Sequence, residues 1–533
     1  MRTNLRPAPR AGATPSVGAS SFHARNSHLR AGGLAARSPG RRVAAPTPAP
    51  WALTPAVNSG AGHPLADHAI SEALGRRAHE IDAAFALIES ELRALAPRQF
   101  EPNFAAEAQA RLRSTLGFEL PLEELAATWS APLDVRRLYA QCVLGTFCRL
   151  IEREFDRSLA ERSDGDDAQS LIRRFGFHAI DVTPCADGRL SGVIDYILRV
   201  PPAVVAYRKS YAGAMFDVEE SLRHWEAVEL GRWREGKPNR ADENTRYLKI
   251  GVYHFSSIDP THEGCAAHGS DTARAGTALL DRLQQFAGAV QQTHCCGAQV
   301  ATLLIGVDTD TDAIRVHVPD AAGLMSIDRR VDNLALYEAT RTLARGEAKE
   351  AIRAAVAECA GVSVDDPQTE GMRWLCAYLL KNNLGQIDAV RAWHGGNYAD
   401  AGHTEQLIVV GDAVDDVQLR NLAFQAQMDT VEEGGADLDI GVSILRGLHE
   451  PRGLAVPVLV HIRYDGRIPG AQDRAVHRAH RLQTAIAARY AALLESGHLL
   501  VRSVVRAAGT SKLTPVSAAS CDAACACRHT ETH

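Results

Sequence analysis

Long hydrophobic runs are missing from this chain of 533 residues. No apolar stretch approaches the ~20 residues that a helix needs to cross a bilayer, and the N-terminus lacks the apolar core of a secretory signal. Its 46% hydrophobic and 23% charged residues are otherwise those of an ordinary globular protein. We therefore expect no membrane association and, from the length, roughly three domains.

Acidic residues and lysine are missing from residues 1–66, which contain eight arginines and many alanines, prolines, glycines and serines. Such a segment buries too little apolar surface to offset its ordering entropy, so the sequence predicts a disordered tail. Organelle transit peptides share this composition. The arginines are spread rather than clustered, which favours a multivalent tether to an acidic protein surface over a nucleic-acid arm.

The cysteines argue against a disulfide framework. The eleven cysteines are odd in number and irregularly spaced, and no secretory signal precedes them. They are therefore available as free thiols or metal ligands. No cysteine lies between positions 377 and 520. Residues 516–533 contain a CxxxCxC pattern, which we interpret as a solvated terminal tail rather than a metal site.

Hydrophobic periodicity divides the rest of the chain into three parts. Residues 67–162 have the period of helices and predict a helical packing domain. In 163–398, apolar strands alternate with long helices, which indicates a mainly parallel α/β sheet. Residues 399–515 repeat this pattern weakly and lack thiols, so we expect a degenerate second copy without a metal site. The strands and helices that we expect in these two parts are strands at 177–182, 247–255, 301–307, 406–412 (entering a helix) and 455–464, and helices at 215–236, 271–296 and 471–495.

A thiol, a carboxylate and a guanidinium follow the first of these strands at a spacing of two, as Cys185, Asp187 and Arg189. Open α/β sheets place their ligands at the carboxyl ends of strands. A catalytic zinc takes three protein ligands, commonly Cys and His. The end of the next strand and the stretch after it supply Cys265 and two competing histidines, His254 and His262.

Two further motifs are less informative. His294-Cys295-Cys296-Gly297 closes a predicted helix, and we interpret it as a structural turn. Asp308-x-Asp310-x-Asp312 begins like a calcium-binding EF-hand loop, but Ala313 and Pro319 stand where that loop needs glycine and glutamate. Calcium is therefore not expected there.

Longer strings carry a family resemblance. CxDxR followed by a strand and His…GC is similar to the β-class carbonic anhydrases. The strings FHAIDVTPCADGRLSG, YRKSYAGAMFD, RYLKIGVYHFSSIDPTHEGCAAHGS, HCCGA and LLIGVDTDTDAIRVH closely resemble the carboxysomal shell carbonic anhydrases, a diverged β-class family of α-carboxysomes. The likeness extends from about residue 70 to 510. It implies a disordered N-terminus, a helical domain, a catalytic α/β domain and a degenerate second carbonic anhydrase domain.

The resemblance also implies a site and an activity. Cys185, His254 and Cys265 would bind one zinc ion per chain, with His254 favoured over His262 because the family's ligand histidine ends the strand. The reaction would be reversible hydration of CO2 to bicarbonate. Asp187 can accept a hydrogen bond from the attacking hydroxide, and Arg189 can keep that carboxylate off the metal. His268 is one candidate for the proton relay.

Location and partners follow from the same resemblance. We expect the chain in the carboxysome, a bacterial microcompartment in the cytoplasm, supplying CO2 to ribulose bisphosphate carboxylase, which its disordered N-terminus would bind. Shell proteins are expected partners, and a homodimer or higher homo-oligomer is expected, without nucleic acid. An alternative function is a zinc-stabilised adaptor between shell and cargo. A zinc deaminase is disfavoured because His262-Glu263 lacks the H-x-E…P-C-x-x-C pattern.

Overall fold

The structure is a computed structural model. It describes residues 62–117, 119, 125, 132–161, 165–201, 204–237, 245–293, 300–366, 370–398, 402–414, 416–417, 419–426, 428 and 431–516. The predicted motif at 294–297 and residues 517–533 of the predicted C-terminal tail lie outside these ranges. None of the described helices combines the length and the apolar character that a membrane span requires.

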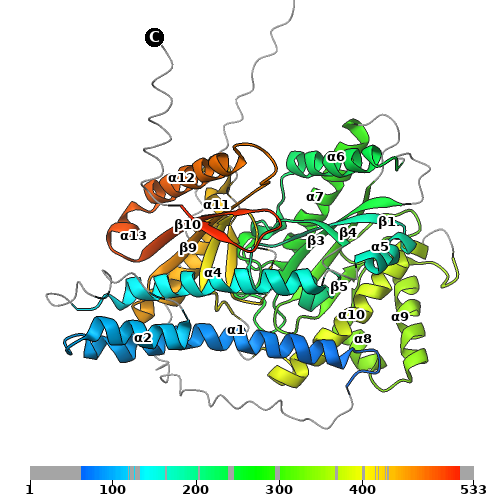
Figure 1. Ribbon diagram of the computed structural model, residues 1–533. Helices are drawn as coiled ribbons and strands as arrows, with labels where there is room; N and C mark the ends of the chain where they lie inside the picture. The colour runs from blue at the N-terminus through cyan, green and yellow to red at the C-terminus, as the bar shows by residue number, and fades with distance from the viewer. Residues whose placement is uncertain are drawn as a thin grey trace, which may run out of the picture. The chain divides into compact units, whose positions relative to one another are not determined.

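The described residues of the N-terminal region include the long helices α1 (His68–Leu95), α2 (Phe104–Leu116) and α4 (Val135–Glu161). Asp67 caps α1 by accepting a hydrogen bond from the Ile70 amide at 3.1 Å. Ile81, Phe85, Ile88 and Leu92 recur at helical spacing and are buried. They pack in one core with residues of α2 and α4, and α1 and α4 lie side by side (Figure 1).

A six-stranded sheet follows, with the strand order β2-β1-β3-β4-β5-β6. The first four strands in this order are parallel, whereas β5 and β6 are antiparallel to their neighbours. Helix α7 packs on β3 and β4, α5 on β1, and α10 on β5. The elements of this part are α5 (Gly165–Arg174), β1 (Phe177–Pro184), η3 (Gly188–Leu190), η4 (Val193–Leu198), β2 (Val205–Arg208), η6 (Ala212–Ala214), α6 (Val218–Arg234), β3 (Arg246–Phe255), η7 (Ala266–His268), α7 (Thr272–Thr293), β4 (Val300–Asp308), β5 (Ile314–His317), β6 (Val331–Asp332), α8 (Asn333–Thr340), α9 (Arg345–Ala360) and α10 (Glu370–His394).

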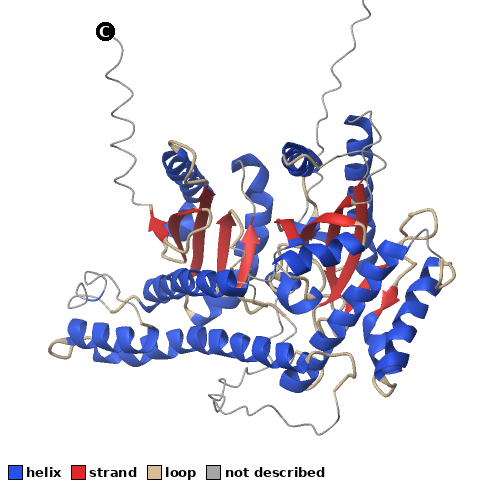
Figure 2. Ribbon diagram, turned by 45° about the vertical axis from the view of Figure 1, so that its right-hand side comes forward, coloured by secondary structure: helices blue, strands red, loops and turns tan. Residues whose placement is uncertain are grey.

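A second, five-stranded sheet has the order β11-β10-β9-β7-β8, parallel except for β11. Figure 2 shows the two sheets as separate groups of strands. The second sheet and its helices comprise β7 (Leu407–Gly411), β8 (Ala423–Ala426), α11 (Val431–His449), η9 (Glu450–Arg452), β9 (Val456–Tyr464), α12 (Ala471–Arg489), α13 (Ala491–Glu495), β10 (Leu499–Ala507) and β11 (Leu513–Pro515).

Helices cover both faces of the second sheet, and alternation along β7 shows how. Leu407 and Val409 belong to the core shared with α1, α2 and α4. Ile408 and Val410 belong to the core formed with α11 and α12. Successive side chains of a strand point to opposite faces, so a strand covered on both sides is apolar throughout. The fold class predicted from the sequence, a helical region followed by two α/β parts, is confirmed.

Two expectations about the second sheet are wrong. The strand at 406–412 does not enter a helix, because Gly411 has a φ of 95° and the Asp412 amide donates to the His461 carbonyl at 2.8 Å. The chain then crosses to the neighbouring strand β8 before α11 begins. The helix expected at 471–495 is interrupted at Tyr490, whose φ of −117° is not helical.

The start of the described chain is fixed on the first α/β part. His63 is fully buried, and its amide donates to Asp388 Oδ2 at 2.8 Å. Its Nε2 lies 2.9 Å from Thr340 Oγ1. Residues 62–66 of the segment predicted to be a tail are therefore packed against α8 and α10.

Candidate metal centre

The first thiol, that of Cys185, directly follows the carboxyl end of β1. The Cys185 amide donates to the Val252 carbonyl at 3.1 Å, and Cys185 forms a parallel bridge with Tyr211. Strand β3 continues past Val252 and ends at Phe255, and His254 is its last residue but one. The side chain of His254 is on the same face of the strand as Val252. Cys185 and His254 therefore stand at neighbouring strand ends of a parallel sheet, where such sheets bind ligands.

The loop that leaves β3 returns Cys265 to the same place. Cys265 precedes the short helix η7, and its carbonyl accepts the amides of His268 and Ser270 at 3.0 and 2.9 Å. Gly264 lies so close to Ser270 that a Cβ atom there would be 2.8 Å from the Ser270 Cα. Only glycine allows this approach without movement of the backbone. The turn thereby fixes the position of the second thiol.

The three side chains converge in the protein interior. Cys185, His254 and Cys265 are all buried, and one ligand atom from each lies within 4.8 Å of the others. The two sulfur atoms are 3.9 Å apart. Hydrogen bonding between the thiols, more than burial, raises the pKa of Cys185, and the same contact lowers the pKa of Cys265. One proton of the pair is thus easier to remove than the other.

The structure separates the two competing histidines. His254 is 1% exposed, and neither of its ring nitrogens has a hydrogen-bond partner among the described residues. Asp187 Oδ2 lies 3.4 Å from Nε2 without forming a hydrogen bond. Burying an imidazole without hydrogen bonds is costly, and native proteins avoid it unless the group has another use. His262 instead has a side chain that is 78% exposed and bonds Asp259 at 2.9 Å.

Asp187 and Arg189 form a closed pair beside the thiols. Arg189 Nε donates to Asp187 Oδ1 at 2.9 Å, and the guanidinium also donates to Asp187 Oδ2 at 2.7 Å. Burial alone would raise the pKa of Asp187, but Arg189, with His254 and His403, holds it well below the usual value. Arg189 is itself secured by the Glu263 carbonyl at 2.8 Å. The carboxylate is therefore ionised and restrained.

The acidic loop that resembles an EF-hand supports the end of β3. Asp308 accepts hydrogen bonds from the amide and hydroxyl of Ser257, at 3.2 and 2.8 Å. Asp310 Oδ2 accepts from the Ser256 hydroxyl and the Ile258 amide, at 2.8 and 2.6 Å. These carboxylates thus bind the backbone of the loop that follows His254.

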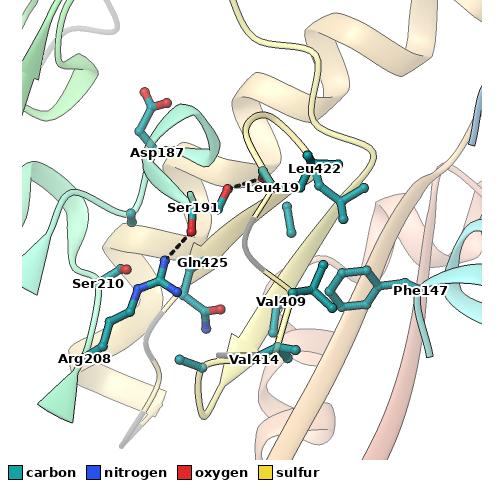
Figure 3. Close-up of a pocket in the computed structure, with 14 residues that line it drawn as sticks. Phe147, Asp187, Ser191, Arg208, Ser210, Val409, Val414, Leu419, Leu422 and Gln425 are labelled. Atoms are coloured by element: carbon teal, nitrogen blue, oxygen red, sulfur yellow. Dashed lines mark hydrogen bonds between the residues drawn. The ribbon is translucent and has the colours of Figure 1, made fainter. Parts of the chain in front are cut away.

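A small cavity of about 30 Å³ lies beside the end of β1 (Figure 3). One wall is apolar, with Phe147 and Val409, and the other is polar, with Arg208 and Gln425. Figure 3 shows the Asp187 carboxylate pointing away from these side chains. The cavity therefore borders the backbone at this position rather than the converging thiols.

The sequence interpretation missed two residues of the site. His403 Nε2 lies 3.7 Å from Asp187 Oδ2, and His403 Nδ1 lies 2.8 Å from Glu405 Oε1. Glu405 also accepts the Gly188 amide at 3.2 Å. The only signal in the sequence is a His-x-Glu directly before a strand. His268, the relay candidate, is buried, with Nε2 3.4 Å from the Gly213 carbonyl.

Known proteins match the chain over most of its length. It matches the family described as Carboxysome Shell Carbonic Anhydrase in three sections: N-terminal over 63–155, catalytic domain over 167–403 and C-terminal over 404–520. The carboxysome shell carbonic anhydrase of Halothiobacillus neapolitanus is 43% identical, with 84% of this chain and 88% of that protein covered. That of Prochlorococcus marinus is 44% identical, with 83% and 86% covered. The chain therefore belongs to the carboxysome shell carbonic anhydrases, the enzymes of the carboxysome that interconvert CO2 and bicarbonate.

Proposed function

We propose that Cys185, His254 and Cys265 bind one catalytic zinc ion, at which the chain hydrates CO2. The observation that carries this proposal is the buried His254 ring, which has no hydrogen-bond partner among the described residues and faces two buried thiols. A metal ion would satisfy all three side chains together.

The donor set and its spacing fit zinc. Two thiolates and one imidazole are ligands that zinc prefers, and a catalytic site keeps its fourth position open. Zn–S bonds of about 2.3 Å in a tetrahedral site place the two sulfurs about 3.8 Å apart. The distance between the Cys185 and Cys265 sulfurs is 3.9 Å. His262 points to solvent, so it does not close the site as a fourth ligand.

Zinc held by Cys185, His254 and Cys265 would supply a Lewis acid that makes hydroxide available near neutral pH. Asp187 is the catalytic residue among the neighbouring groups: its carboxylate would accept a hydrogen bond from the attacking hydroxide and orient its free lone pair towards CO2. Asp187 Oδ2 is suited to this task because it lies 3.4 Å from His254 Nε2, on the side of the ligands.

Arg189 keeps the Asp187 carboxylate from binding the metal. An ionised carboxylate this close to the ligands could otherwise occupy the open fourth coordination position. Arg189 donates from its backbone amide, Nε and a terminal nitrogen to Asp187, at 3.0, 2.9 and 2.7 Å. Bidentate pairs of this type hold both the distance and the plane of the carboxylate. We therefore assign Arg189 a positioning role.

In the cell, the enzyme would supply CO2 to ribulose bisphosphate carboxylase inside the carboxysome. The arginine-rich composition of residues 1–66 supports a salt-sensitive tether between this segment and that enzyme. Contacts with shell proteins and a homo-oligomeric state belong to the same proposal.

Zinc content tests the ligand assignment. His254→Ala should lose bound zinc and CO2 hydration together, and Cys185→Ala and Cys265→Ala should do the same. His262→Ala is the matched control, because its exposed ring is bonded only within its own loop. Elemental analysis of the purified variants gives the answer: zinc retained by His254→Ala and lost from His262→Ala would refute the assignment.

A further inference from the structure

A histidine and a glutamate from the segment between the two sheets stand against the proposed site. This segment, residues 402–406, is held firmly: the Asn421 side chain donates to the Gly402 carbonyl at 2.8 Å, and the Gln406 amide donates to the Leu422 carbonyl at 2.9 Å. The side chain of His403 is 16% exposed, whereas those of Glu405 and Arg189 are 0% exposed. His403 is therefore the member of this group that reaches solvent.

Glu405 sets the protonation pattern of the His403 ring. Its Oε1 lies 2.8 Å from His403 Nδ1 and also accepts the Gly188 amide at 3.2 Å. A carboxylate can only accept, so Nδ1 must carry the hydrogen. The neutral ring then presents a lone pair at Nε2, which is the atom that faces the site.

The surroundings of Nε2 suit both charge states of the ring. Arg189 has a terminal nitrogen 3.4 Å away, which can donate to Nε2 when the ring is neutral. Asp187 Oδ2 lies 3.7 Å away, which favours the imidazolium. Burial lowers the pKa of His403, but Asp187 and Glu405 outweigh burial and Arg189 and raise it. Glu263 is the further charge here, 3.6 Å from Arg189.

We propose that His403 takes the proton released by CO2 hydration out of the site, and that Glu405 is the positioning residue that holds its ring for this transfer. The inference rests on the proposed function of the site. Hydration adds hydroxide to the carbon of CO2 and leaves one proton from the water for each bicarbonate made. Nε2 accepts that proton and becomes an imidazolium, and a buffer base in solution removes it, which restores the neutral ring.

The other histidines near the site are less suited. His268 is 8% exposed, less than the His403 side chain, and its Nε2 faces the Gly213 carbonyl. Burial lowers the pKa of His268, so it gains a proton less readily. His254 is a proposed ligand and has no exposed edge. His262 is turned to its own loop by Asp259.

Buffer dependence separates proton transfer from the chemical step. In His403→Ala, kcat should fall roughly 100-fold or more in weak buffer, because one proton-transfer group contributes on the order of 10²- to 10⁴-fold. The value of kcat/KM and the zinc content should stay near those of the unaltered enzyme. Imidazole added to the buffer should restore kcat. His79→Ala is the control, because His79 is an exposed histidine on α1, and imidazole should raise its kcat no more than it raises that of the unaltered enzyme.

Glu405→Gln tests the positioning role. Loss of the charge should move the pH midpoint of kcat to lower pH, because Glu405 raises the pKa of His403. The inference is wrong if kcat is unchanged in His403→Ala, or if imidazole does not restore the lost kcat. Both outcomes apply only when the unaltered enzyme holds zinc and is active. If the unaltered enzyme itself holds no zinc or hydrates no CO2, the proposed function fails instead.

Discussion

Asp187 is the side chain on which the proposed chemistry depends most. Asp187→Asn keeps the size of the group but removes the charge that pairs with Arg189 and accepts from the hydroxide. We expect zinc to remain bound and kcat/KM for hydration to fall by roughly 100-fold or more, as for loss of a group that contacts the reacting atoms. Stopped-flow hydration measures this loss.

Asp259→Asn is the matched control for that substitution. Its carboxylate is 44% exposed and bonds only groups of its own loop. Hydration should be unaltered in this variant. Equal rates in Asp187→Asn and the unaltered enzyme would remove Asp187 from the mechanism.

Local spacing was enough to predict in part, but not in full, which residues of the candidate site lie close together. Cys185, Asp187 and Arg189 lie close together in the sequence, within residues 185–189, so their proximity in the structure could be predicted. Spacing could not choose between His254 and His262, because the choice depends on which ring the loop turns inwards. His403 lies far along the chain and reaches Asp187 only through the packing of the second sheet.

The loop between β3 and α7 should be sensitive to a single methyl group. A Cβ atom at Gly264 would lie 2.8 Å from the Ser270 Cα and 2.9 Å from its carbonyl oxygen. Gly264→Ala should therefore displace Cys265 and weaken zinc binding by at least tenfold, on the order of 1.4 kcal/mol. A zinc-competition titration with a chelator measures the change.

Gly288→Ala provides the control within the neighbouring helix α7. A Cβ atom there meets nothing within 4 Å, and alanine is the better helix former by about 1 kcal/mol. This variant should keep its zinc affinity and be slightly more stable. If Gly264→Ala binds zinc as tightly as Gly288→Ala, the turn does not position Cys265.

Strand β5 carries a histidine that should make the fold sensitive to acid. His317 is fully buried between the Tyr253 hydroxyl at 2.9 Å and the Ser326 carbonyl at 3.0 Å. Burial, with Arg330 and Arg315 nearby, lowers the pKa of His317 to about 4, so the folded protein keeps the ring neutral. The unfolded chain takes up a proton below pH 6.5.

The stability that the neutral ring provides should therefore be complete above pH 6.5 and disappear as the pH falls towards 4. The lost free energy of unfolding is about 3 kcal/mol. His317→Gln cannot titrate, so its melting temperature should fall less between pH 7.5 and 5. If the melting temperatures of both proteins fall by the same amount over this pH range, His317 is not the cause of the acid sensitivity.

The sequence predicted those strands that consist of a continuous run of buried apolar residues. The apolar runs that became β1, β3, β4 and β9 have one interpretation as buried strands, and the structure confirms them. The prediction failed after β7, because Gly411 and the long-range hydrogen bond from Asp412 to His461 redirect the chain. Such contacts join residues that no local window compares.

At the scale of the whole molecule, the N-terminal segment should be separable from the chemistry. Deletion of residues 1–60 should leave hydration unchanged, because the anchoring residue His63 is retained. It should abolish the salt-sensitive binding to ribulose bisphosphate carboxylase. A pull-down at low and high salt checks this, and undiminished binding by the shortened chain would assign the contact to the folded parts.

The central claim is that one zinc ion held by Cys185, His254 and Cys265 makes this chain a carbonic anhydrase. Its most direct test is to strip the purified protein with a chelator and return zinc in steps while CO2 hydration is followed. We predict that activity disappears on stripping and returns in proportion to added zinc, reaching a plateau at one ion per chain. Hydration that persists without zinc, or a plateau reached only at two ions per chain, would contradict the account.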